Sequence, residues 1–118
     1  MIYGYARIST DKQNMERQIR NILAVNAQAK IYQEVFTGTK TTGRRKLEAL
    51  LKRVQSGDTI IFDSVSRMSR DAEEGYALYK ELYDKGIRLV FINEPYIDTD
   101  VYENARKTLV PLTGTDID

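Results

Sequence analysis

Arginine and hydroxyl side chains stand at the end of the first apolar stretch of the chain, Ile2–Thr10. This stretch predicts a short buried strand that leads into Arg7, Ser9 and Thr10, and open α/β sheets bind ligands at the carboxyl ends of their strands. A serine hydroxyl is a weak nucleophile at neutral pH unless its proton is accepted or its charge is dispersed. We therefore expect Ser9 to act as a nucleophile that depends on nearby positive charge.

Further arginines stand where strands are expected to end or helices to begin, namely Arg44, Arg67 and Arg70. Guanidinium groups hold phosphate oxygens with paired N–H donors and stabilise the charge that builds on a pentavalent phosphorus. The pattern therefore favours phosphoryl transfer over acyl transfer, for which two backbone amides would suffice. The group that takes the serine proton stays open among a water, a neighbouring carboxylate and an arginine that acts through its field.

The composition excludes several classes of site. The 118 residues include no histidine and no cysteine, so a Ser-His-Asp hydrolase and a His/Cys zinc site cannot be built. No apolar run approaches the length of a membrane span, and the lack of cysteine fits the cytoplasm. The length, with 42% hydrophobic and 30% charged residues, is that of one globular domain over residues 1–118.

The charges are divided unevenly along the chain. Residues 1–70 carry 13 Lys and Arg against 6 Asp and Glu, whereas residues 71–118 carry 5 against 11. This division indicates that one face attracts phosphate while another face meets a different partner. Chance segregation over a solvated surface explains the charges equally well.

Apolar periodicity predicts strands that alternate with helices. Strands are expected over 2–10, 31–36, 59–62 and 87–93, and helices over 13–27, 44–56, 72–85 and from 99 or 100 towards Pro111. Such alternation predicts an α/β fold of three layers, with a mainly parallel sheet of four or five strands between helices. The carboxyl ends of its strands would bring Ser9 and the arginines to one edge.

Four local features bear on this edge. Thr10 or Asp11 is expected to cap the first helix, whose free N–H groups would suit an anion behind Ser9. The loop 37–43 resembles a mobile loop near a ligand, or a plain surface connection. Residues 44–46 place three cations in a first helical turn, a cost that a bound phosphate would offset. Arg67 and Arg70 would point the same way on a helical turn, although a solvated face is the usual role of such a pair.

Two motifs together resemble the catalytic domain of serine recombinases, the family of transposon resolvases, DNA invertases and large phage-type integrases. The first is YGYARIST at 3–10, followed by Gln13 and Gln18; Arg44 with Leu47 comes next, and the second motif is SRMSRD at 66–71. The resemblance covers essentially the whole chain.

The resemblance implies an activity and roles for single residues. It implies that Ser9 attacks a DNA phosphodiester and forms a 5′-phosphoserine link with a free 3′-hydroxyl. Arg7, Arg67 and Arg70 match the arginines that bind and activate the scissile phosphate. The supporting active-site positions are matched by Arg44, Gln13 and Gln18. The resemblance also implies DNA as the partner, a homodimer on each site, a homotetramer in the synapse, and no metal or nucleotide cofactor.

The sequence departs from the small resolvases at two places. Many of them carry an aspartate where Ser66 stands, which leaves the proton-handling role unassigned. Residues 96–118 look more like the large recombinases. We therefore expect an isolated catalytic domain, with weak DNA affinity and weak dimerisation by itself, and expect a long helix and DNA-reading domains after Asp118.

Three alternative interpretations remain. A flavodoxin-like module could bind phosphate or a nucleotide without cleavage, and an interaction domain could keep the recombinase fold for assembly only. Asp63 ends a strand, as the phosphorylated aspartate of a response-regulator receiver does. A receiver also needs acidic residues after its first strand, where this chain has Arg7 and Ser9.

Overall fold

The computed structural model describes residues 1–8, 12–35, 45–69 and 71–105. Its centre is a parallel sheet of four strands in the order β2-β1-β3-β4. The strands are β1 (Ile2–Ile8), β2 (Lys30–Val35), β3 (Thr59–Phe62) and β4 (Arg88–Phe91). The expected parallel α/β sheet is thus confirmed.

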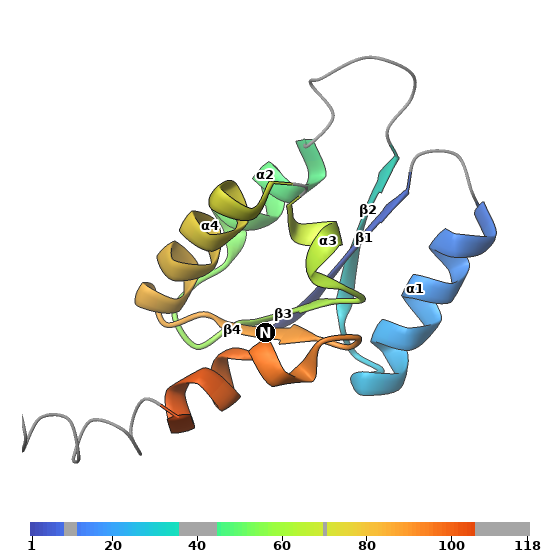
Figure 1. Cartoon of the computed structure of the whole chain (residues 1–118). Coiled ribbons are helices and arrows are strands. Elements are labelled where there is room, and N and C mark those ends of the chain that lie inside the picture. The colour runs from blue at the N-terminus through green and yellow to red at the C-terminus, as the bar shows by residue number, and fades with distance from the viewer. Residues whose placement is uncertain (9–11, 36–44, 70, 106–118) are drawn as a thin grey trace, which may run out of the picture.

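Helices cover both faces of the sheet, as the sequence predicts (Figure 1). They are α1 (Lys12–Val25) on one face, with α2 (Arg45–Arg53), α3 (Val65–Met68) and α4 (Ala72–Asp84) on the other. A 3-10 turn, η1 (Pro95–Ile97), and a helix over 99–105 follow β4. None of the helices in the described ranges is long and apolar enough to cross a membrane.

Residues of β1 alternate between two apolar cores because successive side chains of a strand point to opposite faces. Ala6 and Ile8 pack with Met15 and Ile22 of α1. The helix approaches so closely at Gly4 that a Cβ there would lie 2.6 Å from Ile22 Cγ2. The odd-numbered residues of β1 face α2 and α3, and this alternation directs the Arg7 side chain towards that second layer.

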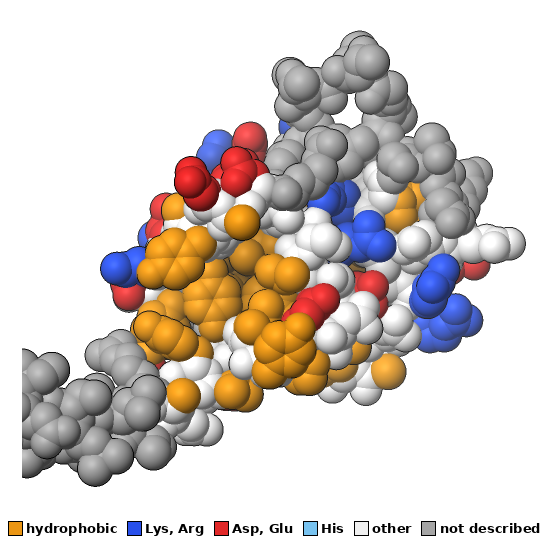
Figure 2. All heavy atoms as spheres, in the orientation of Figure 1, with side chains coloured by type: hydrophobic (Ala, Val, Ile, Leu, Met, Phe, Trp, Pro, Cys, Tyr) orange, Lys and Arg blue, Asp and Glu red, His pale blue; other side chains and the backbone are white. Residues whose placement is uncertain are grey.

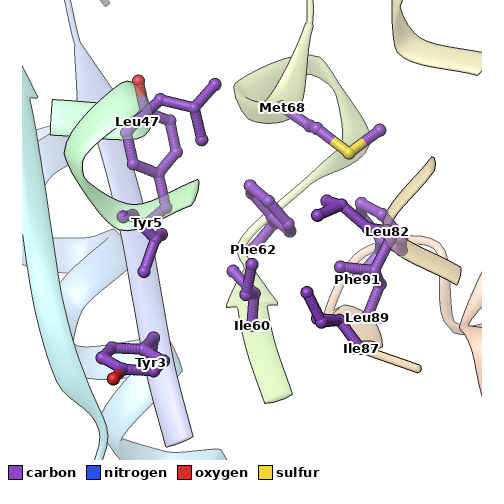
Figure 3. Close-up of a cluster of buried hydrophobic side chains, with 11 residues drawn as sticks. Tyr3, Tyr5, Leu47, Ile60, Phe62, Met68, Leu82, Ile87, Leu89 and Phe91 are labelled. Carbon is purple, nitrogen blue, oxygen red and sulfur yellow. The ribbon is translucent and has the colours of Figure 1, made fainter. Parts of the chain in front are cut away.

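Aromatic rings fill the second core, between the sheet and α2, α3 and α4 (Figure 3). Phe62 of β3 stacks on Phe91 of β4 with centroids 5.3 Å apart, and Tyr5 meets Phe62 edge-on at 5.9 Å. Met68, the last residue of α3, is buried in the same cluster. The core therefore contacts α3 through Met68 and through the partly buried Val65.

A buried carboxylate from β2 occupies the amino terminus of α2. Glu34 Oε1 accepts hydrogen bonds from the backbone N of Lys46 at 3.1 Å and of Leu47 at 3.2 Å, and from the Tyr5 hydroxyl at 3.0 Å. A carboxylate at a helix N-terminus offsets the unfavourable cations of the first turn. Glu34 therefore offsets part of the cost of these cations from within the protein, and the expected effect of a bound phosphate stays a prediction.

The segment after β4 covers the edge of the sheet and forms an apolar groove. Thr99 Oγ1 accepts a hydrogen bond from Leu89 N at 2.9 Å, and Asp98 Oδ1 accepts one from Phe91 N at 2.6 Å. Between α4 and the helix over 99–105 lies a groove of about 690 Å³, seen as the orange patch in Figure 2. Its exposed tyrosines are Tyr76, Tyr96 and Tyr102. One end of the groove is made by α3.

Candidate active site

Arg7 is a buried cation near the carboxyl end of β1, with 6% of its surface exposed. Its Nη2 donates a hydrogen bond to the backbone carbonyl oxygen of Ser66 in α3. The bond joins the end of β1 to the element that follows β3, across 59 residues of sequence. The expected gathering of the two motifs at one edge of the sheet is thereby observed for these described residues.

Gln18 of α1 holds the backbone of Arg7. Its Oε1 accepts a hydrogen bond from Arg7 N at 3.0 Å, and its Nε2 donates one to Arg7 O at 3.0 Å. On this side of β1 the neighbouring strand β3 pairs only as far as Tyr5, so the backbone N–H and C=O of Arg7 bind Gln18 and not a strand. Gln18 is 1% exposed, so the amide replaces a neighbouring strand inside the protein.

Asn14 connects Gln18 to Arg67 and was not singled out from the sequence. Its Oδ1 accepts hydrogen bonds from Gln18 Nε2 at 2.6 Å and from Arg67 Nη2 at 3.3 Å. Asn14 lies four residues before Gln18, on the same face of α1. That spacing was the available signal, but only the fold shows that Arg67 approaches this face.

Arg67 lies in a helix of four residues, and this alters the expected relation to Arg70. Ser69 caps the carboxyl end of α3 in an extended conformation, with φ −157° and ψ 149°. The expectation that one helical turn carries both arginines is therefore wrong, because the turn ends between them. Arg67 approaches Asn14, and Arg70 lies outside the described residues.

The structure places only part of the predicted site. Arg7, Gln18 and Arg67 are joined through hydrogen bonds with Asn14 and Ser66. Gln13 lies in the first turn of α1, with an exposed side chain. The remaining predicted features, Ser9, Thr10, Asp11, the loop 37–43, Arg44 and Arg70, fall outside the described residues.

Two carboxylates lie beyond the ends of β3 and β4. Asp63 is buried and accepts hydrogen bonds from the side-chain amides of Asn21 at 3.1 Å and Asn93 at 3.5 Å. Glu94, which sequence reasoning missed, accepts from Val65 N and Ser64 Oγ at the start of α3. Among the described residues, no acidic side chains form a group of three or more that could hold a metal ion.

This arrangement suits a negatively charged ligand. Two guanidinium groups from different elements enter one hydrogen-bonded network, and the groups that fix them are neutral amides and a carbonyl oxygen. The partners in these contacts are neutral, so the contacts themselves do not cancel the charge of either guanidinium. Such fixed positive charge can stabilise an anion or a transition state that gains negative charge.

Known proteins are similar to this chain in sequence. A family model described as resolvase, N-terminal domain, matches residues 2–113. A resolvase from Clostridium perfringens is 32% identical over 100 residues, which are 84% of this chain and 52% of that protein. The Tn3 transposon resolvase of Escherichia coli is 34% identical over 100 residues, 84% of this chain and 53% of that protein. The chain thus spans about half the length of these relatives.

A solved structure supports the same fold. A resolvase family site-specific recombinase from Streptococcus pneumoniae aligns with 98% of this chain and 94% of its own, with a TM-score of 0.61 and 19% identity. At that identity the likeness concerns the fold alone. The solved structure thus agrees in fold with the family match. That match, across residues 2–113, shows that the chain belongs to the resolvase N-terminal domain family, the catalytic domain of serine recombinases.

Proposed function

We propose that this chain is the catalytic domain of a site-specific DNA recombinase in which Ser9 is the nucleophile. The observation that carries the proposal is the network of Arg7, Ser66, Asn14 and Arg67 at the carboxyl end of β1. Ser9 follows Arg7 by two residues in the sequence, and this closeness along the chain supports its assignment as the nucleophile. Several relatives are named as transposon resolvases, which supports DNA as the substrate.

The proposed reaction is a transfer of the phosphodiester from DNA to protein and back. Ser9 Oγ forms a bond to phosphorus as its proton leaves, and the bond from phosphorus to the 3′ oxygen breaks as that oxygen takes up a proton. The products are a 5′-phosphoserine link and a free 3′-hydroxyl. The ester retains the energy of the broken bond, so rejoining after strand exchange needs no ATP, and we propose that no metal takes part.

We assign distinct roles to the site residues. Arg7 and Arg67, with Arg70, bind the scissile phosphate and stabilise the charge of its transition state. Arg44, which precedes α2 in the sequence, and Gln13 in the first turn of α1 support the site. Gln18 holds Arg7 through its backbone and is a positioning residue.

We propose that the complete protein works on DNA as a dimer at each site and as a tetramer in the synapse. The matched region makes up about half of each relative, and we place the segments that read DNA and assemble the complex outside residues 1–118. This chain alone would then bind DNA weakly. The site of action would be the cytoplasm, where bacterial DNA lies.

The covalent intermediate provides the test. The full-length protein is expressed in its source organism, the cells are denatured rapidly, and DNA that stays attached to the protein is recovered and sequenced. Wild type is expected to yield adducts at one recurrent DNA sequence, and Ser9→Ala none. Adducts that persist in Ser9→Ala would refute the assignment. A folded wild type that binds nucleotides without forming adducts would instead support the non-cleaving phosphate-binding module.

A further inference from the structure

The short helix α3 presents one side to the arginine network and another side to the apolar groove. Ser66 supplies the carbonyl oxygen for Arg7, and Arg67 reaches Asn14. Val65, Met68 and Ser69 contribute to the wall of the groove. In Figure 2, Lys and Arg side chains lie beside the orange patch of that groove. The position of this one turn therefore decides where Arg67 lies.

A single helical turn does not hold its position by its own hydrogen bonds. Within α3 and its caps, Arg67 N donates to Ser64 O at 3.0 Å and Ser69 N donates to Val65 O at 3.3 Å. The few hydrogen bonds that one turn can form weigh little against the backbone entropy of ordering it. Met68 is buried in the aromatic core and the partly buried Val65 packs against it, so apolar contacts reach both ends of the turn, but the backbone N–H groups at its amino end still need a polar partner.

Glu94 supplies that polar partner from the segment after β4. Its Oε1 accepts a hydrogen bond from Val65 N at 2.8 Å, and its Oε2 accepts one from Ser64 Oγ at 2.9 Å. The backbone of Glu94 is fixed in turn, because its N donates to Phe91 O at 3.1 Å and Pro95 follows it at the start of η1. A carboxylate that receives two donors in this way forms strong, directional bonds.

We propose that Glu94 is a positioning residue for DNA cleavage, which it serves by anchoring the amino end of α3. The inference rests on the function proposed above. Glu94 contacts Ser64 and Val65, the residues immediately before Ser66, whose carbonyl meets Arg7. Loss of the anchor lets α3 shift, and Arg67 moves with it relative to the phosphate. Displacements of about 1 Å at a reacting centre can lower a rate by as much as about 100-fold.

The test compares variants of the full-length protein on the DNA duplex identified from the recovered adducts. The rate of Ser9 adduct formation is measured in a single turnover with the duplex saturated by protein, beside the dissociation constant and the thermal midpoint. Glu94→Ala is expected to slow adduct formation in the bound complex by about 10- to 100-fold. Glu94→Gln keeps an acceptor for Val65 N and a polar group for Ser64, and should recover most of the rate.

Asp100→Ala provides the matched control. Asp100 is an exposed carboxylate on the same segment after β4, and its hydrogen bonds go to Arg88. This variant should cleave at the wild-type rate. Should Glu94→Ala fail to fold, Ser64→Ala removes one of the two contacts of Glu94 and is expected to give a smaller loss of rate.

A double-mutant comparison separates positioning from general stability. If Glu94 acts through Arg67, the loss caused by Glu94→Ala shrinks in an Arg67→Lys background. A Glu94→Ala protein that cleaves bound DNA at the wild-type rate, or losses that multiply independently, would overturn the inference while leaving the proposed function intact. A wild type without any Ser9 adduct would overturn both.

Discussion

At the scale of single residues, the site depends on side-chain amides that bind groups without a partner in the sheet, such as the backbone N–H and C=O of Arg7. The arginines bring the positive charge, but Gln18 and Asn14 decide where Arg7 and Arg67 lie. These amides carry no charge, so their contacts direct the two arginines without adding a negative charge beside them.

Replacement of Gln18 should destabilise the domain strongly. Gln18→Leu keeps the side-chain volume but leaves the backbone N–H and C=O of Arg7 buried without the amide. Each lost partner costs about 1–3 kcal/mol, so the free energy of unfolding should fall by about 2–5 kcal/mol. Urea unfolding followed by circular dichroism measures this change. Gln33→Leu, at an exposed position of β2, is the control and should remain within about 0.5 kcal/mol of wild type.

Replacement of Asn14 should impair cleavage more than folding. Asn14→Ala removes the oxygen shared by Gln18 Nε2 and Arg67 Nη2, at a partly buried place where water can substitute in part. We expect adduct formation on bound DNA to slow by about 10-fold or more, since Arg67 loses an orienting partner. The single-turnover assay of the full-length protein measures it, with Asn26→Ala at the far end of α1 as control. Equal rates for the two variants would show that Asn14 does not orient Arg67.

At the scale of elements, the fold places helices by means of carboxylates from neighbouring strands and loops. Glu34 on β2 caps α2, and Glu94 after β4 caps α3. Both contacts join residues well apart in the chain, so helix position follows sheet order. The sheet therefore determines where α2 and α3 begin, because it positions the carboxylates that cap them.

Removal of the Glu34 carboxylate should loosen α2. Glu34→Ala leaves two backbone N–H groups and the Tyr5 hydroxyl without their acceptor, and should cost about 2–4 kcal/mol of unfolding free energy. Glu48→Ala, on an exposed face of the same helix, should cost little. Tyr5→Phe combined with Glu34→Ala should cost less than the sum of both, because one hydrogen bond is removed twice. Strict additivity would contradict the buried contact.

The contact between α4 and η1 should make stability fall at alkaline pH. Burial, together with the Asp98 carboxylate, raises the pKa of Tyr79 to about 12 from its ordinary value of 10.0. The Tyr79 hydroxyl donates to Ile97 O at 2.6 Å. Between these values the unfolded chain releases the phenolic proton before the folded protein does, so the contribution is full below pH 10 and is lost as pH rises through 12.

Chemical unfolding at a series of pH values tests this contribution. Tyr79→Phe should be less stable than wild type at pH 9, and the difference should shrink between pH 10 and 12. Tyr76→Phe, which removes an exposed hydroxyl of the same helix, is expected to follow wild type throughout. A difference between Tyr79→Phe and wild type that stays constant up to pH 12 would contradict the shifted titration.

The sequence predicted the fold correctly where the pattern of apolar residues lies within a single strand or helix. The four apolar strands and the stripe of Met15, Ile19 and Ile22 on α1 are local patterns, and all of them appear in the structure within a few residues. Glu34 and Glu94 act across distant parts of the chain, so their spacing showed no pattern. Asn14 stands four residues before Gln18, but only the fold brings Arg67 to it. The supposed common turn of Arg67 and Arg70 failed because the extended backbone of Ser69 ends the helix.

At the scale of the whole molecule, the division of charge along the chain coincides with two different surfaces. Arg7 and Arg67 lie in the basic first part, at the carboxyl end of β1 and beyond β3. The apolar groove with its exposed tyrosines lies mostly in the acidic second part, between α4 and the helix over 99–105. The short α3 contributes to both surfaces, because it lines the groove and also carries Arg67.

The central claim is that Ser9 receives the DNA phosphate, and mass spectrometry of the trapped adduct tests it most directly. Trypsin cleaves after Arg7 and Lys12, so digestion of the nuclease-trimmed adduct yields the peptide 8–12, which contains both Ser9 and Thr10. Fragmentation of this peptide locates the added nucleotide phosphate on one hydroxyl or the other. We predict that it is carried by Ser9; a phosphate on Thr10, or on any of the tyrosines instead, would contradict the account.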